Sequence, residues 1–183
     1  MKPCIGLVTS GLNVAPLWWA LQEKAELWDQ VPDRTTPVDS PHYGLHDIYI
    51  RYSKNDPRDI DQHESEWYPA ADVLPVKPLI FQLMSAMQGE RLGGVLITRI
   101  PAGMSCKPHS DGGWHARYYE KFGIQIASAP GQAFCFENER LVTKPGDVFW
   151  FDNSHSHWVE NPTAHERITL IVTLKRGGIY ASN

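Results

Sequence analysis

The second half of the chain consists of short β-prone segments separated by turn residues. Turn signals stand at Pro101, Gly131, Pro145 and Asn161, between runs rich in β-branched and aromatic residues. Many short strands joined by regular turns are typical of a jelly roll or barrel. We therefore predict a mainly β (α+β) fold, with strands at about residues 94–100, 121–128, 132–137, 147–151, 155–160 and 167–174.

The first half of the chain is expected to support this β core. Pro16 opens a helical pattern that runs to Trp28, and a second helical pattern covers residues 77–88. Between them, residues 46–52 alternate as a strand does, with two isoleucines on one face. The helices should pack outside the sheet. Polar connections are expected at residues 29–41 and at residues 53–75, the latter as a long connection or partial lid.

Length and charge favour one globular unit with an anion-binding half. The 183 residues, 42% of them hydrophobic, can bury one substantial core. We expect a single domain over residues 1–183, with a support region at 1–92 and a β core at 93–176 that carries the site. Residues 76–183 hold eleven Lys and Arg against nine Asp and Glu, although the net charge is −4. This mild excess suits an anionic ligand but is not the basic stripe of a nucleic-acid binder, so nucleic acid is not an expected partner.

The cysteines and the hydropathy pattern favour a cytoplasmic protein. Cys4, Cys106 and Cys135 are odd in number and widely spaced, unlike a disulfide framework or a zinc knuckle. No stretch approaches 18 consecutive apolar residues, and the N-terminus lacks the apolar run of a secretion signal. A membrane partner is therefore not expected, and nothing in the sequence indicates an oligomeric state.

Two histidines and one aspartate of the second half are spaced like the ligands of a metal. His109 and Asp111 stand at i and i+2 and project from the same face of an extended strand. His157 follows 46 residues after Asp111, and two histidines with one carboxylate form the facial triad of non-haem Fe(II) sites. Ten residues beyond His157, the guanidinium of Arg167 could hold a dicarboxylate. His155 would share a strand face with His157 and is the competing ligand.

This combination resembles the signature of the Fe(II)/2-oxoglutarate dioxygenases: His-x-Asp, a distant histidine, and an arginine ten residues later. Within that superfamily, the run KPGDVFWFDNSHSHWVENPTAHERITLIV at residues 144–172 resembles the aspartyl/asparaginyl β-hydroxylase family. The resemblance covers about residues 94–175. It implies a double-stranded β-helix (jelly-roll, cupin-like) core with the N-terminal helices packed outside.

The resemblance also implies roles for individual residues. Fe(II) would be held by His109, Asp111 and His157 as the catalytic centre, and the distal carboxylate of 2-oxoglutarate by Arg167. Thr98 lies where the family places a hydroxyl residue near the co-substrate. The implied reaction consumes O2 and 2-oxoglutarate, releases succinate and CO2, and hydroxylates an unactivated C–H bond.

Three positions differ among relatives of this family. Asp111 is present here, whereas the β-hydroxylases of epidermal-growth-factor-like domains lack this carboxylate. The chain therefore resembles a bacterial-type relative with a full triad. Lys121 takes the approximate place of an arginine on the C1 side of 2-oxoglutarate, where it could supply a point charge. Gly123 stands where those enzymes have a histidine.

Residues near the expected mouth of the site are candidates for substrate contacts. Trp114 and Arg117 lie in a predicted loop after Asp111, and His155 lies beside the distal histidine. Arg51 projects from the first half of the chain, as do His42 and Asp47, and all three read equally well as solvated residues. The substrate would be an amino acid, a peptidyl side chain or another small molecule. The glycine-containing segment from residue 103 to residue 119 is expected to be a mobile flap.

Two other functions fit the same ligands. A cupin-like sensor could bind metal and 2-oxoglutarate without turnover. A zinc hydrolase could use two histidines and a carboxylate with an open position, although no HExxH helix or obvious general-base glutamate accompanies them.

Overall fold

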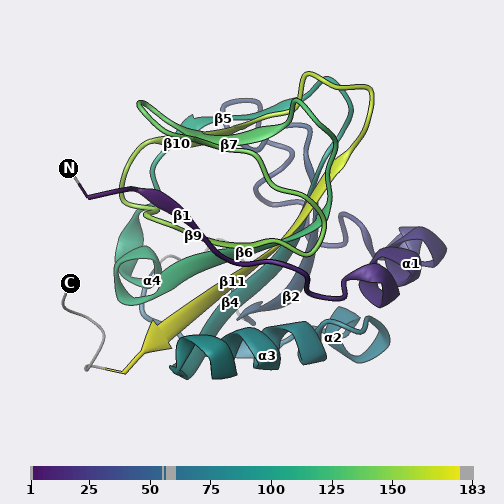
Figure 1. Cartoon of the computed structure of the whole chain (residues 1–183). Helices are drawn as coiled ribbons and strands as arrows, with labels where there is room; N and C mark the ends of the chain where they lie inside the picture. The colour runs from purple at the N-terminus through teal and green to yellow at the C-terminus, as the bar shows by residue number, and fades with distance from the viewer. Residues whose placement is uncertain (1, 55, 57–60, 178–183) are drawn as a thin grey trace.

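Two β-sheets lie face to face, and a layer of helices covers the outer face of the larger sheet (Figure 1). The computed structural model describes residues 2–54, 56 and 61–177. The described strands pair antiparallel throughout. This arrangement is the predicted mainly β fold with helices outside.

The larger sheet has seven strands in the order β1-β9-β6-β11-β4-β2-β3. Their bounds are β1 Ile5–Thr9, β9 Val148–Phe151, β6 Glu120–Ala127, β11 Arg167–Arg176, β4 Gly89–Ile100, β2 His46–Ser53 and β3 Ser65–Trp67. The smaller sheet has four strands in the order β5-β10-β7-β8. These are β5 Ser105–His109, β10 His157–Glu160, β7 Ala133–Phe136 and β8 Arg140–Leu141.

Four α-helices and a short 3-10 helix complete the described part of the chain. They are α1 Ala15–Glu23, the 3-10 turn Ala25–Leu27, α2 Ala70–Val73, α3 Lys77–Met87 and α4 Gly113–Tyr118. Both α1 and α3 begin with a proline in the first turn, where the missing N–H removes no helical hydrogen bond. Helix α3 ends at Gln88, which adopts the left-handed conformation that closes many helices.

Strand alternation separates the core from the site. In β11 the even-numbered residues Ile168, Leu170 and Val172 are fully buried against the helix layer. The odd-numbered Arg167 and Thr169 face the other way, toward the smaller sheet. Because side chains of a strand alternate between faces, one apolar row builds the core while a polar row lines the space between the sheets.

The space between the sheets is filled on one side by aromatic rings. Phe134 and Phe136 of the smaller sheet pack against Phe149 and Phe151 of the larger one, and all four are buried. Aromatic pairs in this edge-to-face and tilted geometry stabilise by about 1 kcal/mol beyond their burial. This cluster holds the sheets apart at one end and leaves a polar cavity beside it.

Several predicted elements are found within two residues of their predicted ends, but the segment after Pro101 differs from its prediction. Residues 103–119 were expected to be a mobile flap, with His109 and Asp111 together on an extended stretch. Instead β5 runs to His109 and α4 follows from Gly113 to Tyr118. The Trp114 and Tyr118 rings stack at 4.6 Å one helical turn apart, which stabilises this short helix. Whether the segment moves on ligand binding stays a prediction.

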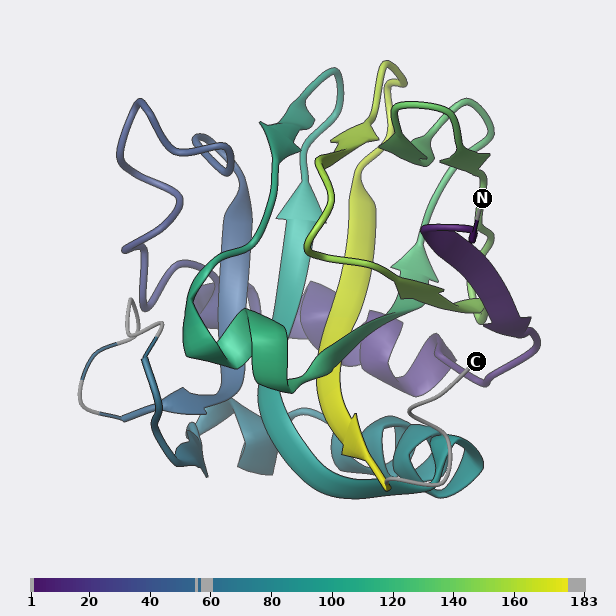
Figure 2. The same ribbon diagram turned by 90° about the vertical axis from the view of Figure 1, so that its left-hand side faces the viewer.

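The long loop before β2 reaches the smaller sheet (Figure 2). The Pro41 carbonyl accepts a hydrogen bond from the Lys107 N–H of β5 at 2.9 Å. At the other end of the loop, the Asp29 N–H donates to the Asp47 carbonyl at 2.9 Å. The loop therefore spans from the edge of the larger sheet to β5, beside the cavity.

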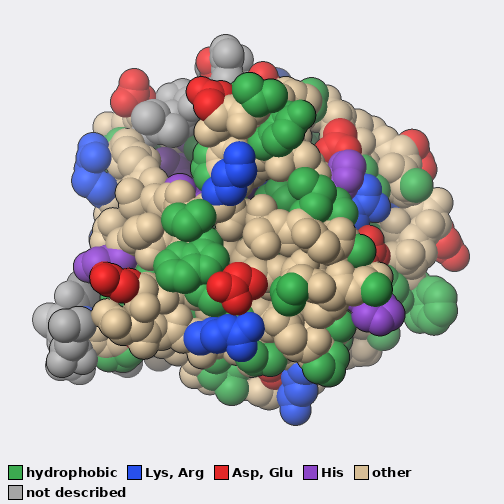
Figure 3. All heavy atoms as spheres, turned by 90° about the horizontal axis from the view of Figure 1, so that it is seen from above, with side chains coloured by type: hydrophobic (Ala, Val, Ile, Leu, Met, Phe, Trp, Pro, Cys, Tyr) green, Lys and Arg blue, Asp and Glu red, His purple; other side chains and the backbone are tan. Residues whose placement is uncertain are grey.

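The outer surface carries charges of both signs. Seen from above the smaller sheet, Lys and Arg side chains are interspersed with Asp, Glu and hydrophobic ones (Figure 3). This face is unlike the continuous basic surface of nucleic-acid-binding proteins. In the described part of the chain, no helix has the length and apolar character that crossing a membrane requires.

Candidate active site

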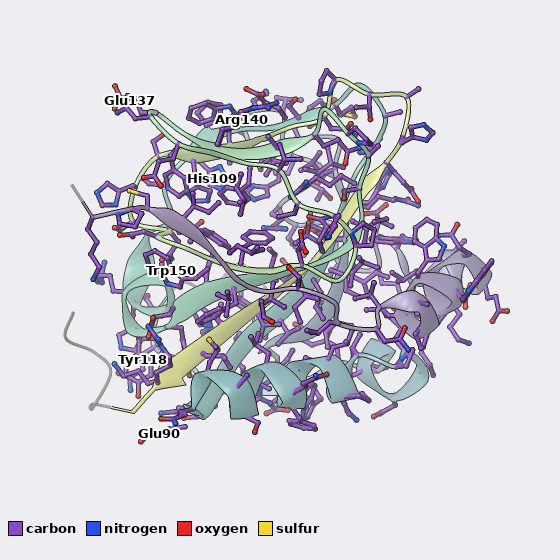
Figure 4. The ribbon with its side chains drawn as sticks, viewed as in Figure 1. Glu90, His109, Tyr118, Glu137, Arg140 and Trp150 are labelled. Atoms are coloured by element: carbon purple, nitrogen blue, oxygen red, sulfur yellow. The ribbon has the colours of Figure 1, made fainter. Side chains whose placement is uncertain are left out.

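The structure brings His109, Asp111 and His157 together between the sheets. His157 of β10 is the direct cross-strand partner of His109 of β5. Asp111 Oδ1 lies 3.8 Å from His109 Nε2, and Asp111 Oδ2 lies 4.0 Å from His157 Nε2. The three ligand atoms lie within 4.8 Å of one another. Figure 4 shows His109 in the space between the two sheets.

Backbone carbonyls orient both imidazoles. His109 Nδ1 lies 2.8 Å from the Lys107 carbonyl oxygen, and His157 Nδ1 lies 2.9 Å from the His155 carbonyl oxygen. A carbonyl can only accept, so Nδ1 carries the proton in each ring and Nε2 keeps its lone pair. Both lone pairs therefore face the Asp111 carboxylate, as metal ligands do when a second hydrogen bond fixes the ring.

The protonation states also suit a metal. Burial lowers the pKa of His157 to about 4 and lowers the pKa of His109, so both rings are neutral at neutral pH. Burial acts to raise the pKa of Asp111, but the charge and hydrogen bond of Lys121, together with His157 and His109, outweigh it, so the net shift is downward. Two neutral imidazoles and one carboxylate are a donor set that fits Fe(II), and these three residues would hold it.

A second group of possible ligands adjoins this one. His42, Cys106 and His109 also place their ligand atoms within 4.8 Å of one another. Burial raises the pKa of the Cys106 thiol to about 12, so its sulfur is protonated at neutral pH. Thiolate, not thiol, is the effective metal ligand. The group that contains Asp111 is therefore the better fit for a divalent iron.

Lys121 binds the carboxylate of the triad. Its Nζ donates to Asp111 Oδ2 at 2.5 Å, from β6 of the larger sheet. The backbone N–H of Asp111 donates to the Asn153 carbonyl at 2.9 Å, which fixes the base of the side chain. Lys121, predicted to lie near the C1 carboxylate of 2-oxoglutarate, thus stands at the edge of the metal site.

Arg167 is a fully buried guanidinium that lines the same cavity. The residue is 1% exposed, and its Nη2 donates to Thr143 Oγ1 at 3.1 Å. Its Nη1 is buried and has no hydrogen-bond partner among the described residues. Burial lowers its pKa to about 10, which still leaves it charged at neutral pH. A buried charge without an anion costs free energy, so this site is built for an anionic ligand.

The cavity that joins these residues has a volume of about 90 Å³. A larger cavity of about 300 Å³ adjoins it. Arg34, His42, Asp111 and Lys121 line both and so mark the boundary between them. We call the first the inner cavity and the second the outer cavity.

A polar row crosses the floor of the larger sheet beneath the inner cavity. Asp47, Thr98, Thr169 and Gln125 are successive cross-strand partners on β2, β4, β11 and β6. Thr98 Oγ1 donates to Asp47 Oδ1 at 2.8 Å. Thr98, predicted to lie near the co-substrate, therefore lines the inner cavity and is hydrogen-bonded to a buried carboxylate.

Sequence reasoning missed Arg34. Its Nε and Nη2 donate to the two oxygens of Asp47 at 2.5 and 2.9 Å, and Nη2 also donates to Thr98 Oγ1 at 2.8 Å. The one available signal was Asp47, an acid next to the apolar residues of a predicted strand, which requires a cationic partner if it is buried. His42 was considered only as a solvated residue or a residue of the mouth, yet its ring meets that of His109 at 4.7 Å.

Four residues named as substrate contacts lie outside the lining of both cavities. Trp114 stacks on Tyr118, and Arg117 and His155 are exposed. Arg51 packs over the Trp67 ring at 5.2 Å. None of the four lines the inner or the outer cavity. From α4, His115 and Ala116 line the outer cavity instead.

The presence of a glycine at position 123 has a steric explanation. A Cβ at this position would lie 2.2 Å from Cζ of Phe149, on the neighbouring strand. Phe149 is fully buried, so its ring fills the space that a side chain at residue 123 would need. No contact to a ligand can come from this position.

Three solved structures of similar fold are described as an oxygenase or as prolyl hydroxylases. A prolyl-4-hydroxylase from Pseudomonas putida is 15% identical, with 96% of this chain and 94% of that one covered at a TM-score of 0.58. A prolyl hydroxylase from Trichoplax adhaerens, solved with a peptide fragment of the hypoxia inducible factor, is 12% identical, with 94% and 83% covered at 0.60. A 2OG-Fe(II) oxygenase family protein from Burkholderia pseudomallei is 16% identical, with 73% and 67% covered at 0.54.

The family comparison is more specific than these likenesses of fold. Residues 70–177, more than half of the chain, match the family described as Aspartyl/Asparaginyl beta-hydroxylase. A comparison with curated proteins found no match. The matched range contains His109, Asp111, His157 and Arg167, but it begins after Arg34. The chain therefore belongs to the aspartyl/asparaginyl β-hydroxylase family, within the 2-oxoglutarate- and Fe(II)-dependent oxygenases.

Proposed function

We propose that this protein is a dioxygenase that hydroxylates an unactivated C–H bond of an amino-acid, peptidyl or other small substrate. His109, Asp111 and His157 would hold Fe(II), and Arg167 would hold 2-oxoglutarate. One observation carries the proposal: a buried guanidinium with an unpartnered Nη1 lines the same cavity as three convergent metal ligands. A resident metal alone would explain the ligands but not Arg167.

The protein's own residues would bind and orient the metal and 2-oxoglutarate and shield them from water. When bound, the metal and 2-oxoglutarate supply the oxidising chemistry, in which O2 is consumed and succinate and CO2 are released. Arg167 would fix one carboxylate of 2-oxoglutarate at the closed end of the cavity, where a charge pair is little screened. Thr98 adds a hydroxyl, and Lys121 adds a positive charge beside Asp111. The rings of Phe134 and Phe151 exclude water from the inner wall.

The experiment that tests the proposal separates binding from turnover. First, 2-oxoglutarate is titrated into the Mn(II)-loaded protein, and binding in the micromolar range is expected. Second, succinate release is measured under air with Fe(II) and ascorbate, with and without pools of amino acids and peptides. A gain of one oxygen on a pool member, detected by mass spectrometry, identifies the substrate. Absence of 2-oxoglutarate binding would overturn the proposal.

Two alternatives give different results in the same experiment. A sensor would bind 2-oxoglutarate but release no succinate in the presence of any pool. A zinc hydrolase would bind metal without needing 2-oxoglutarate. No glutamate lines the inner or the outer cavity, so no general base of the metalloprotease kind faces the ligands there. No observation favours the hydrolase over the oxygenase.

A further inference from the structure

We propose that the outer cavity binds the substrate through a carboxylate group and that Arg34 is its anchor. This inference rests on the proposed function, because it assigns the inner cavity to 2-oxoglutarate. It also names a residue outside the range that matches the family, and a substrate class that the match does not specify.

Arg34 is held at the boundary of the two cavities. Asp47 binds Nε and Nη2 of the guanidinium, and Thr98 binds Nη2 as well. The remaining nitrogen, Nη1, has no hydrogen-bond partner among the described residues, and the side chain is 28% exposed. A planar fork that is clamped on one edge presents its other nitrogen in a fixed direction. Both cavities are lined by this residue, so that direction is available to a ligand.

A stabilising role alone does not explain the buried ion pair between Arg34 and Asp47. Asp47, the second residue of β2, is 1% exposed, and its carboxylate is fully enclosed. Burying an ion pair in such a place is often neutral or unfavourable for stability compared with apolar residues of similar volume. Stability is therefore a weak reason for the pair, and holding a guanidinium at a cavity boundary is a stronger one.

The charges at the two cavities leave room for one more anion. Three cationic side chains line them, Arg34, Lys121 and Arg167, against the carboxylate of Asp111 in the lining and that of Asp47 behind it. Fe(II) and 2-oxoglutarate carry equal and opposite charges, so loading both preserves the positive excess. A substrate with one free carboxylate would neutralise it.

The walls of the outer cavity suit the rest of such a substrate. Tyr49, Tyr52 and His115 surround it, and burial keeps His115 neutral by lowering its pKa to about 3. A Cβ at Gly94 would lie 2.7 Å from the Tyr52 ring and 3.3 Å from the His115 ring. The glycine thus lets both rings pack against the strand. A volume of about 300 Å³ is at the small end of ligand pockets, which favours a small acid over a folded protein domain.

The test uses the Mn(II)- and 2-oxoglutarate-loaded protein, which does not turn over. A set of free L-amino acids, hydroxy acids and short peptides is screened by thermal shift beside the matching carboxamides. Stabilising compounds are expected among the acids, with their amides at least about tenfold weaker by titration calorimetry. Amides that bind as well as the acids would overturn the proposal, and so would a set in which no acid binds.

Variants then test whether Arg34 is the residue that binds the carboxylate of the substrate. Arg34→Gln should weaken the best acid at least about tenfold and leave 2-oxoglutarate affinity within a few-fold of the parent. Because this change leaves Asp47 unpaired, the double variant Arg34→Gln/Asp47→Asn is measured in parallel, since it buries no lone charge. Arg140→Gln is the matched control: it lies on β8, half-exposed, on the outer side of the smaller sheet (Figure 4).

The outcomes distinguish this inference from the proposed function. If the parent protein fails to bind 2-oxoglutarate, the proposed function fails. If the parent binds it but the Arg34 variants do not, Arg34 is a co-substrate residue and the substrate assignment is overturned. If acids bind the double variant as tightly as the parent, Arg34 is not their anchor.

Discussion

Lys121 Nζ lies 2.5 Å from Asp111 Oδ2, the same oxygen that faces His157 Nε2 at 4.0 Å. The ammonium therefore occupies one side of the carboxylate that a metal would approach from another. In the metal-free protein the pKa of Asp111 is lowered although burial acts to raise it, because the charge and hydrogen bond of Lys121, together with the two histidines, outweigh that burial. A bound metal would take over that role, because a divalent cation neutralises the carboxylate more strongly than an ammonium does.

This pair predicts a change in stability that metal reverses. Lys121→Met removes the cation but keeps an unbranched side chain of nearly the same length, so metal-free protein should lose about 2 kcal/mol of unfolding free energy. Saturating Mn(II) should restore most of the loss, measured by urea unfolding with and without metal. Lys77→Met is the control, because its ion pair with Asp72 is exposed and should matter by less than 1 kcal/mol. A variant that loses Mn(II) affinity would contradict this account.

Arg167→Ala should separate metal binding from co-substrate binding. Truncating one partner of a buried charge pair costs about 2–5 kcal/mol, so the affinity for 2-oxoglutarate should fall by a factor of roughly 30 or more. Mn(II) binding should be spared, because Arg167 contacts Thr143 and no metal ligand. Titration of 2-oxoglutarate into the Mn(II)-loaded variant measures the effect, with Arg140→Ala as the exposed control. An affinity within a few-fold of the parent would remove the strongest link to the oxygenase reaction.

The two neighbouring histidines should behave differently toward metal. His157→Ala is expected to remove most Fe(II) or Mn(II) binding, because it deletes one of three convergent ligands. His155→Ala should change metal affinity little, since that ring is exposed and bonds with Asp152 and Ser154. Equilibrium dialysis of both variants, with circular dichroism as the check on folding, decides the matter. Equal losses in the two would mean that the ligand assignment is wrong.

The strands and the two faces of the larger sheet could be predicted from the sequence, because side chains alternate between the two faces of a strand. Ile48 and Ile50 face the helices as predicted, and Asp47 faces the other side of the same strand. The predicted ligands do lie together, but a shared strand face is not the reason. His109 is the last residue of β5, whereas Asp111 lies beyond that strand and is held by the hydrogen bond from its N–H to the Asn153 carbonyl. Local periodicity therefore accounts for positions such as Ile48 and Asp47, and it does not account for Asp111.

Contacts made by irregular backbone could not be inferred in this way. Arg34 lies in a loop with no periodicity, and only the folded path of that loop brings it to Asp47. Helix α4 begins at Gly113, next to Gly112, and this glycine pair suggested a loop. The helix forms because Trp114 and Tyr118 stack and His115 packs inward. Lys121 reaches Asp111 across the gap between two sheets, a juxtaposition set by sheet packing.

His115 predicts how stability depends on pH. Its Nε2 accepts a hydrogen bond from the Gly94 N–H at 3.2 Å, and its ring stacks on His63 at 5.3 Å. Burial chiefly, with the nearby Lys121 charge, lowers its pKa to about 3, whereas an unfolded histidine titrates near 6.5. Between these values the unfolded chain binds a proton that the folded chain does not, so stability falls as pH falls below about 6.5.

The size of this effect follows from linkage. Between pH 7.5 and pH 5.0, His115 alone should cost the metal-free protein about 2 kcal/mol, since each pH unit below 6.5 contributes about 1.4 kcal/mol per proton. His115→Gln keeps an acceptor for the Gly94 N–H but has no titrating group, so its stability should fall by about 2 kcal/mol less over the same range. Urea unfolding of both proteins at the two pH values gives the difference. Equal losses in the parent and the variant would show that His115 is protonated in the folded state at pH 5.0.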